Sequence, residues 1–335
     1  MTIYYQPIVR MGADRALGAY RLAGGACWFD QAIMRRRGQA DQWIAADDIP
    51  PAVLARLTRT SRPIAGMDMD RPHLMGILNV TPDSFSDGGK FCAADVAVSH
   101  AVAMVQAGAS IIDIGGESTR PGAETVAVEV EIARTAPVIA AIRAQSDRPI
   151  SIDTRKAPVA QAAIAAGANL VNDVSALAYD MATAAVTAQA GVPVCLMHAQ
   201  GAPATMQQDP RYDDVLLDVY DYLAQRIDHA VAAGIARDRI VVDPGIGFGK
   251  TLDHNLALLR GLSLFHALGC PVLLGASRKK FIGTLGGGQD AADRVPGSVA
   301  VALHGARQGV QLLRVHDISA TKQALDLEWA INGAV

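Results

Sequence analysis

Alanine-rich stretches with helical periodicity alternate with short runs of β-branched residues along most of this chain. Six of the helical stretches end at a glycine, and a run that is apolar on both faces follows within a few residues. Glycine just after a helix adopts the left-handed conformation that turns the chain back, and such runs are typical of parallel strands covered by helices. These glycines are Gly108, Gly167, Gly191, Gly234, Gly269 and Gly309.

Eight strands are expected from this pattern. Six runs follow those glycines, and two more lie at residues 74–78 and 149–152. The segments between the runs place apolar residues one helical turn apart, which predicts one face of each helix against the sheet. The stripes are Val98, Val102 and Val105; Val215, Val219 and Tyr222; and Ala320, Ala324, Leu327 and Ile331.

The number of units predicts the architecture. Eight strand–helix units from residue 73 onward would span about 260 residues, close to the length of a (β/α)8 barrel. We therefore expect an α/β fold in which residues 73–335 form a (β/α)8 barrel and residues 1–72 form an N-terminal extension. An open, doubly wound sheet uses the same alternation and remains the alternative.

Residues 1–72 do not follow this rhythm. They contain Trp28 and Trp43, and residues 19–22 read as a strand, so we expect an ordered extension packed on the barrel. The basic run at residues 35–37 is more typical of a solvated helix face than of an anion site. The sequence assigns the extension no role.

Composition narrows the functional classes. Half of the residues are apolar and 19% are charged, which excludes general disorder, and the net charge of −3 offers no broad basic surface for nucleic acid. No apolar run approaches the roughly 20 residues of a membrane helix, and the N-terminus does not resemble a secretory signal. The four widely spaced cysteines argue against a disulfide framework or a zinc site. We expect a cytoplasmic protein without a nucleic-acid or membrane partner.

Polar residues follow seven of the eight expected strands. In a barrel of this kind, function lies at the carboxyl ends of the strands. One Asp or Asn there often only caps the next helix, but seven polar ends on one rim predict a site. The positions are Asn79; Glu117 with Thr119 and Arg120; Asp153; Asn172 with Asp173; Asp243; Ser277 with Arg278 and Lys279; and Arg314 with His316 and Asp317.

The residue types at this rim suit an anionic ligand. Arg120, Arg314 and His316 would hold a phosphorylated group, and Asn79 would suit Mg²⁺ on a diphosphate. Residues 245–251 look like a phosphate-binding loop, but their glycine spacing fits neither the Walker A nor the dinucleotide-binding motif. Those glycines instead predict a close backbone approach to a flat ligand, or a sharp turn with positive φ.

Six segments carry a family resemblance. They are residues 75–89 (MGILNVTPDSFSDGG), 113–122 (DIGGESTRPG), 151–154 (SIDT), 243–250 (DPGIGFGK), 277–279 (SRK) and 314–317 (RVHD). In this order they resemble the dihydropteroate synthases, from about residue 72 to the end of the chain. That family consists of TIM barrels, in agreement with the units counted above.

The resemblance implies an activity. It is the transfer of 6-hydroxymethyl-7,8-dihydropterin from its diphosphate to p-aminobenzoate in folate biosynthesis, with Mg²⁺ as cofactor. It also implies a homodimer and a target of sulfonamides. Both substrates are small molecules, and the mechanism is expected to be dissociative, with diphosphate leaving before the amine attacks.

The resemblance also assigns roles to individual residues. Asp153, Lys279, Arg314 and His316 would be catalytic, and Asn79 would bind the metal. The pterin site would comprise Asp153, Asn172, Met197, Asp243, Phe248, Gly275 and Lys279. The diphosphate site would comprise Asn79, Arg120, Arg314 and His316, and the p-aminobenzoate site Phe85, Thr119, Pro121 and Ser277. Asp243 suits the pterin edge because a carboxylate accepts two adjacent N–H donors.

Two other functions remain open. A methyltetrahydrofolate–corrinoid methyltransferase shares the barrel and a pterin pocket, but it has no diphosphate to hold. An inactive pterin-binding paralogue would bind substrate without turnover. Release of diphosphate on mixing the two substrates separates both from the synthase.

Overall fold

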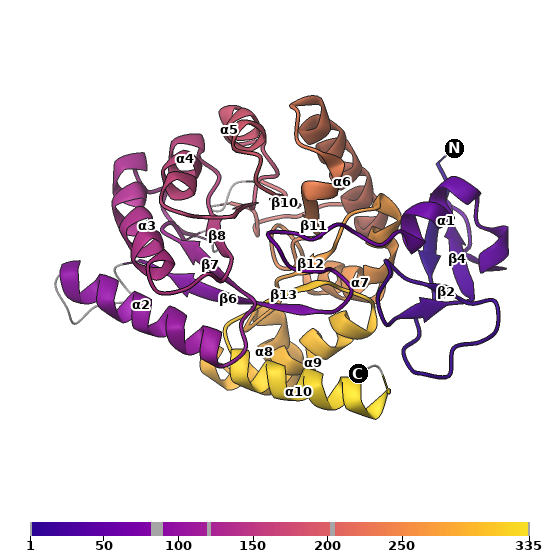
Figure 1. Ribbon diagram of the computed structural model, residues 1–335. Helices are drawn as coiled ribbons and strands as arrows, with labels where there is room; N and C mark the ends of the chain where they lie inside the picture. The colour runs from indigo at the N-terminus through magenta and orange to yellow at the C-terminus, as the bar shows by residue number, and fades with distance from the viewer. Residues whose placement is uncertain (1, 82–89, 119–121, 202–204, 334–335) are drawn as a thin grey trace.

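A computed structural model describes residues 2–81, 90–118, 122–201 and 205–333, with the side chains of residues 90–94 left out. Eight parallel strands occupy its centre (Figure 1). Their sheet order is β11-β10-β9-β8-β7-β6-β13-β12. The bounds are β6 (His73–Asn79), β7 (Ile111–Gly115), β8 (Ile150–Asp153), β9 (Leu170–Asp173), β10 (Val194–Met197), β11 (Ile240–Asp243), β12 (Leu273–Leu274) and β13 (Leu312–Val315).

The sheet closes on itself between β11 and β12. A parallel bridge joins Val242 to Val272, and the Val242 N–H donates to the Pro271 carbonyl at 2.9 Å. This closure confirms the expected barrel and rules out the open sheet. All six junction glycines have positive φ, between 65° and 115°, as their position after each helix predicts.

Helices surround the barrel (Figure 1). They are α2 (Lys90–Gln106), α3 (Val128–Arg143), α4 (Ala157–Ala165), α5 (Ala182–Ala190), α6 (Val215–Ala232), α7 (Leu252–Arg260), α8 (Lys280–Gly286), α9 (Val295–Arg307) and α10 (Ile318–Ile331). The 3₁₀ segments η3 (Arg237–Arg239), η4 (Leu262–Leu268) and η5 (Ala291–Arg294) precede β11, β12 and α9. None of the described helices is long and apolar enough to cross a membrane.

The expected helix stripes are found on α2 and α6, but the stripe on α10 is wrong. Val98 and Val219 are buried in the core between helices and strands. On α10 the buried residues include Ile318 and Leu325, whereas Leu327 and Ile331 are 59% and 79% exposed. Helical spacing identifies an apolar face but does not show whether that face packs against the barrel. In α10, the face that carries Ile318 and Leu325 packs against the barrel instead.

The amino end of the barrel is closed by the chain that leads into it. Ile64, Met67 and Met69 pack with the first residues of the strands, including Met75 and Ile111, in one buried apolar cluster. At the opposite end of the barrel, strands β6, β8 and β11 finish at the polar residues Asn79, Asp153 and Asp243.

Residues 4–58 form a separate set of strands beside η4. The sheet is β1 (Tyr4–Pro7), β4 (Gln31–Arg35) and β5 (Gln42–Ala45); β2 (Tyr20–Arg21) pairs with β3 (Trp28–Phe29), followed by η1 (Ala46–Asp48) and α1 (Pro51–Thr58). Hydrogen bonds tie this unit to η4: Ser263 Oγ donates to the Pro7 carbonyl at 2.8 Å, and Arg56 Nε to the Ala267 carbonyl at 2.8 Å. The division of the chain at residue 72 stays a prediction.

The expectation for the basic run at residues 35–37 is wrong. Arg35 ends a strand, and the Arg37 guanidinium binds Asp218 at 2.6 Å and Asp221 at 2.8 Å, both on α6. The run therefore lies on no helix. Acidic partners more than 180 positions away cannot be identified from the run itself.

Candidate functional site

The carboxyl ends of β6 to β9 bring predicted site residues into one row. In the strand register Asn79 lies opposite Gly115, and Gly115 lies opposite Asp153. Asp153 in turn lies opposite Asn172. A Cβ at Gly115 would lie 3.6 Å from both Asn79 Oδ1 and Asp153 Cβ, so this glycine leaves room between the two side chains. The row forms one wall of the barrel mouth.

Arg314 on β13 connects this wall to the interior of the barrel. Its Nε donates to Asp113 Oδ2 at 2.6 Å, and one of its terminal nitrogens donates to Asp153 Oδ2 at 2.7 Å. Asn172 Nδ2 reaches both oxygens of Asp113, at 3.3 and 3.4 Å. Asp113 is fully buried. It fixes both Arg314 and Asn172, although no role was predicted for it.

Asp153 keeps one oxygen for another partner. Its Oδ1 is buried and accepts no hydrogen bond from any residue in the described part of the chain. Burial raises the pKa of this carboxyl to about 7, against the lowering effect of Arg314. A buried acceptor left open at a barrel mouth is suited to a ligand N–H.

Asp243 lies on the opposite side of the mouth, at the end of β11. Its Oδ1 accepts the Gly245 N–H at 2.7 Å, and burial raises its pKa. At Gly275, a Cβ would lie 3.6 Å from Asp243 Oδ2 and 3.8 Å from Arg314 Cδ. Met197 is paired with Asp243 in the strand register. The glycine thus leaves room beside the Asp243 carboxylate and the methylene groups of Arg314.

The glycines at residues 245–249 serve a sharp turn. Gly245, Gly247 and Gly249 have φ of 68°, 83° and 62°. A Cβ at Gly245 would collide with the His198 carbonyl oxygen of the neighbouring loop. This confirms the expectation of positive φ, and the close approach is to protein backbone.

The Lys250 side chain contacts both this turn and the neighbouring His198 loop. Its ammonium is buried and donates to the Phe248 carbonyl at 3.0 Å, and it lies 2.9 Å from His198 Nδ1. Burial lowers the pKa of Lys250, and burial beside Lys250 lowers the pKa of His198 to about 2. The lysine is therefore used inside the protein, and not as the phosphate ligand of a Walker A loop.

Lys279 extends over the same turn from the loop after β12. It donates a hydrogen bond to the Ile246 carbonyl, and its ammonium lies 4.5 Å from the centre of the Phe248 ring. Burial lowers its pKa to about 8, partly offset by Asp243. Lys279, Phe248 and Asp243 therefore form one side of the mouth.

Ser277 and His316 join the last two strand ends. Ser277 Oγ lies 3.0 Å from His316 Nδ1 and accepts the His316 N–H at 3.2 Å. The neighbouring Arg278 and Asp317 form an ion pair with each other, at 2.5 to 3.0 Å. Arg278 and Asp317 therefore bind each other, whereas Ser277 and His316 contact each other and lie two positions from Lys279 and Arg314 in the sequence.

The structure brings most of the predicted site together. Six residues converge through the contacts above: Asn79, Asp153, Asn172, Asp243, Lys279 and Arg314. Met197, Phe248 and Gly275 lie next to Asp243 or Lys279, and Ser277 and His316 contact each other after the last two strands. Phe85, Thr119, Arg120 and Pro121 lie outside the described residues. Sequence reasoning missed Asp113, whose signal was a single carboxylate within an otherwise apolar strand.

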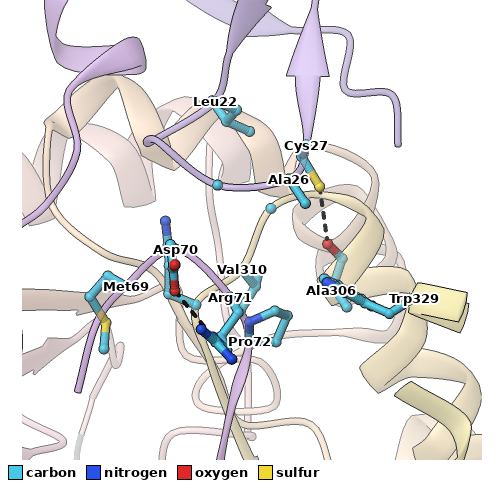
Figure 2. Close-up of a pocket in the computed structure, with 13 residues that line it drawn as sticks. Leu22, Ala26, Cys27, Met69, Asp70, Arg71, Pro72, Ala306, Val310 and Trp329 are labelled. Atoms are coloured by element: carbon cyan, nitrogen blue, oxygen red, sulfur yellow. Dashed lines mark hydrogen bonds and ion pairs between the residues drawn. The ribbon is translucent and has the colours of Figure 1, made fainter. Parts of the chain in front are cut away.

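A small cavity elsewhere has no share in this site. It lies between the N-terminal unit and α9, where Cys27 Sγ is 3.6 Å from the Ala306 carbonyl (Figure 2). Met69 and Pro72 also line it, near the amino end of the barrel. Its volume is about 20 Å³, which leaves room for about one water molecule.

Known proteins share the barrel and its motifs. Residues 75–316 match a family model described as pterin binding enzyme. Dihydropteroate synthase of Escherichia coli strain K12 is 48% identical over 259 residues, which is 77% of this chain and 91% of the relative. Residues that precede the first motif lie outside the family model.

Solved structures agree with these matches. The Xanthomonas albilineans dihydropteroate synthase with 4-aminobenzoic acid has a TM-score of 0.75 and 48% identity, covering 80% of this chain and 96% of that chain. The Yersinia pestis dihydropteroate synthase in complex with a sulfonamide drug has a TM-score of 0.76 and 46% identity, covering 82% and 98%.

Proposed function

Because this chain belongs to the pterin-binding enzymes of the dihydropteroate synthase family, we propose that it condenses 6-hydroxymethyl-7,8-dihydropterin diphosphate with p-aminobenzoate. The products are 7,8-dihydropteroate and diphosphate, so the enzyme is a transferase of folate biosynthesis. One observation carries the proposal: two buried carboxylates at the barrel mouth each lie near a cation. Asp153 accepts a hydrogen bond from Arg314 at 2.7 Å, and Asp243 interacts electrostatically with Lys279.

The pterin ring fits between these carboxylates. We assign its 2-amino group and adjacent ring N–H to Asp243, whose Oδ2 faces the open space at Gly275. The open Oδ1 of Asp153 and the amide of Asn172 take the remaining ring nitrogens. Lys279 donates to the ring carbonyl and N5. Met197 and Phe248 supply apolar surface for the faces of the ring.

The diphosphate extends toward Arg314 and His316, with Asn79 and Arg120 completing its site. Guanidinium groups match phosphate oxygens in bidentate geometry. The p-aminobenzoate is assigned to Ser277 together with Phe85, Thr119 and Pro121. The Ser277 hydroxyl lies 3.0 Å from His316 Nδ1, which supports assigning the two substrates to neighbouring sites.

We propose Mg²⁺ as a cofactor that enters with the substrate. No group of three or more His, Cys, Asp or Glu side chains suited to a metal lies among the described residues. Mg²⁺ commonly binds one or two protein oxygens and completes its shell with water and substrate phosphates, so Asn79 fits as a single protein ligand. When bound, the ion would neutralise charge on the diphosphate.

The proposed chemistry is dissociative. The bond between the exocyclic carbon and the diphosphate oxygen breaks, while Arg314 and His316 stabilise the departing charge. The electron-rich ring and the ionised Asp153 stabilise the resulting cation. The p-aminobenzoate nitrogen then attacks this carbon and loses a proton to solvent. Aromatic amines are unprotonated near neutral pH, so the step requires no strong general base.

Mass-spectrometric detection of 7,8-dihydropteroate after mixing both substrates with the chain tests the function. Formation of 7,8-dihydropteroate only when p-aminobenzoate is present would support the synthase function. Methyl transfer dependent on a cobalamin protein would support the corrinoid methyltransferase instead. Calorimetric binding of the pterin diphosphate without any product would support an inactive paralogue.

We further propose a cytoplasmic homodimer that sulfonamides inhibit. The exposed Leu327 and Ile331 leave apolar surface on α10, which is suited to contact with a second copy. Sulfonamides resemble p-aminobenzoate and would compete for its site. Sedimentation velocity tests the dimer, and competition against p-aminobenzoate tests the inhibitor.

A further inference from the structure

The N-terminal unit of residues 4–58 lies at one side of the barrel and contacts α6 (Figure 1). The family model begins only at residue 75. The Escherichia coli relative aligns over 91% of its own length with 259 residues of this chain, so the rest of that relative is too short for such a unit. The contacts of the unit are therefore a feature that the family match does not explain.

Arg37, in the turn between β4 and β5, binds α6 through two carboxylates. Its guanidinium donates to Asp218 Oδ1 at 2.6 Å and to Asp221 Oδ2 at 2.8 Å. These two residues lie three positions apart and therefore share one face of the helix. Tyr4 of the same unit donates to Asp221 Oδ2 at 2.8 Å. The N-terminal unit thus binds α6 close to the start of the helix.

Asp218 also binds the segment that leads into α6. Its Oδ2 accepts the N–H of Asp213 at 3.0 Å and the N–H of Asp214 at 3.2 Å. Asp214 is the N-cap of the helix and accepts the N–H groups of Leu216 and Leu217. One oxygen of the Asp218 carboxylate therefore faces the N-terminal unit, and the other fixes the course of the chain just before the helix.

Tyr212, one residue before the first of these N–H groups, connects the segment to the turn at residues 245–249. Its hydroxyl donates to the Gly249 carbonyl at 2.7 Å. The centre of its ring lies 5.9 Å from that of His198 and 4.9 Å from that of His254. Burial raises the pKa of Tyr212, and Asp218 raises it further, so the hydroxyl stays protonated and can donate.

The turn that Tyr212 binds carries groups assigned above to the pterin. Phe248 directly precedes Gly249, and its ring centre lies 4.5 Å from the Lys279 ammonium. At the other end of the turn, the Gly245 N–H donates to Asp243 Oδ1 at 2.7 Å. A displacement of the Gly249 end would therefore move the aromatic ring that we assign to the face of the pterin.

We propose that Arg37 is a positioning residue for the pterin site, and that the N-terminal unit acts on this site through Asp218 and Tyr212. The inference rests on the proposed function. Hydrogen bonds and packed side chains that follow one another in this way can couple distant sites. An exposed ion pair contributes little to stability by itself, so we expect the effect in substrate binding and not in unfolding.

The matched variants D218N and D221N test this route in the full chain. Each removes one negative charge that Arg37 binds, but only Asp218 also binds the chain before α6. We expect the KM for the dihydropterin diphosphate to rise about threefold to thirtyfold in D218N and in R37M, with kcat changed less than about twofold. In D221N both constants should change less than about twofold. R37K keeps a positive charge near Asp218 and should give a smaller rise than R37M.

A double-mutant cycle tests whether the effect passes through Tyr212. Y212F removes the hydroxyl that binds Gly249 and should itself raise the KM for the dihydropterin diphosphate. Addition of R37M to Y212F should then cause no further rise, because the two residues act in one series of contacts. Additive effects of R37M and Y212F, or equal effects of D218N and D221N, would overturn the proposal. If D218N fails to fold, the cycle decides.

Hydrogen exchange tests the same route without substrate. Peptides covering residues 212–218 and 245–250 should exchange faster in R37M than in the wild-type chain, and at the wild-type rate in D221N. Unchanged exchange in R37M would overturn the proposal. A wild-type chain that forms no 7,8-dihydropteroate would overturn the proposed function instead, and the exchange measurement would still decide whether Arg37 holds the turn.

Discussion

Arg314 Nε donates a hydrogen bond to Asp113 Oδ2 at 2.6 Å, and Asp113 is completely buried inside the barrel. A second carboxylate, Asp153, binds the same guanidinium at 2.7 Å. Although burial alone would lower it, Asp113 and Asp153 raise the pKa of Arg314. The cation assigned to the leaving group is therefore fixed in position before any substrate binds.

Replacing Asp113 by Asn tests this arrangement. An amide still accepts a hydrogen bond from Arg314 but no longer neutralises it, so we expect kcat to fall about tenfold or more. The free energy of unfolding should fall by about 1–3 kcal/mol, because a buried charge loses a partner. Steady-state kinetics and urea unfolding measure the two effects. D326N, in a surface ion pair with Lys322, is the control and should change neither quantity. Wild-type kinetics in D113N would show that Arg314 does not need the charge of Asp113.

Asp243 is expected to determine pterin affinity. In D243N the side chain can still accept the Gly245 N–H, but the paired N–H donors of the pterin lose one charged acceptor. We expect binding of 6-hydroxymethylpterin to weaken by about 2–5 kcal/mol, measured by titration calorimetry. The variant D209N, at an exposed ion pair, should bind normally. Unchanged affinity in D243N would remove Asp243 from the pterin site.

The pH dependence of kcat/KM for the dihydropterin diphosphate should have two limbs. Burial raises the pKa of Asp153 to about 7, so activity should fall below this pH as the carboxylate that stabilises the cation becomes protonated. Burial lowers the pKa of Lys279 to about 8, so activity should fall above that pH as the donor loses its charge.

Variants assign the two limbs. D153N should lack the acidic limb, and K279R should move the alkaline limb to higher pH because a guanidinium stays protonated. In D113N the acidic limb should move to lower pH, because the negative charge of Asp113 raises the pKa of Asp153. A profile that is flat from pH 6 to 9 would contradict both assignments.

His266 should make the fold less stable in acid. Burial in η4 lowers its pKa from 6.5 to about 4. Above pH 6.5 the ring is neutral in both states, so it adds no pH dependence. Between pH 6.5 and 5 the unfolded chain binds a proton that the folded chain does not, which costs about 2 kcal/mol. Urea unfolding should therefore show a smaller loss of stability over this range in H266Q. An equal loss in both proteins would mean that His266 titrates normally when folded.

The sequence predicted the barrel well because its signals are local. Each junction glycine needs positive φ at a helix end, and each strand is apolar on both faces, so order and number followed from short windows. The ends of the strands then placed Asn79, Asp153 and Asp243 on one rim, because parallel strands share an edge.

The parts that were missed depend on long-range contacts. Asp113 lies inside an apolar strand, and only the fold shows that Arg314, 201 positions later, neutralises it. The partners of Arg37 on α6 are equally distant in sequence. On α10, Leu327 and Ile331 share a helical stripe, but spacing cannot reveal that another face of the helix meets the barrel.

Diphosphate release is the most direct test of the account. The full chain, mixed with 6-hydroxymethyl-7,8-dihydropterin diphosphate, p-aminobenzoate and Mg²⁺, should release one diphosphate for each 7,8-dihydropteroate formed. Omission of p-aminobenzoate should abolish product, and chelation of Mg²⁺ should slow turnover. Binding of the pterin diphosphate without release of diphosphate would contradict the proposed reaction. Product formed at the full rate in the presence of a chelator would contradict the role of Mg²⁺ at the leaving group.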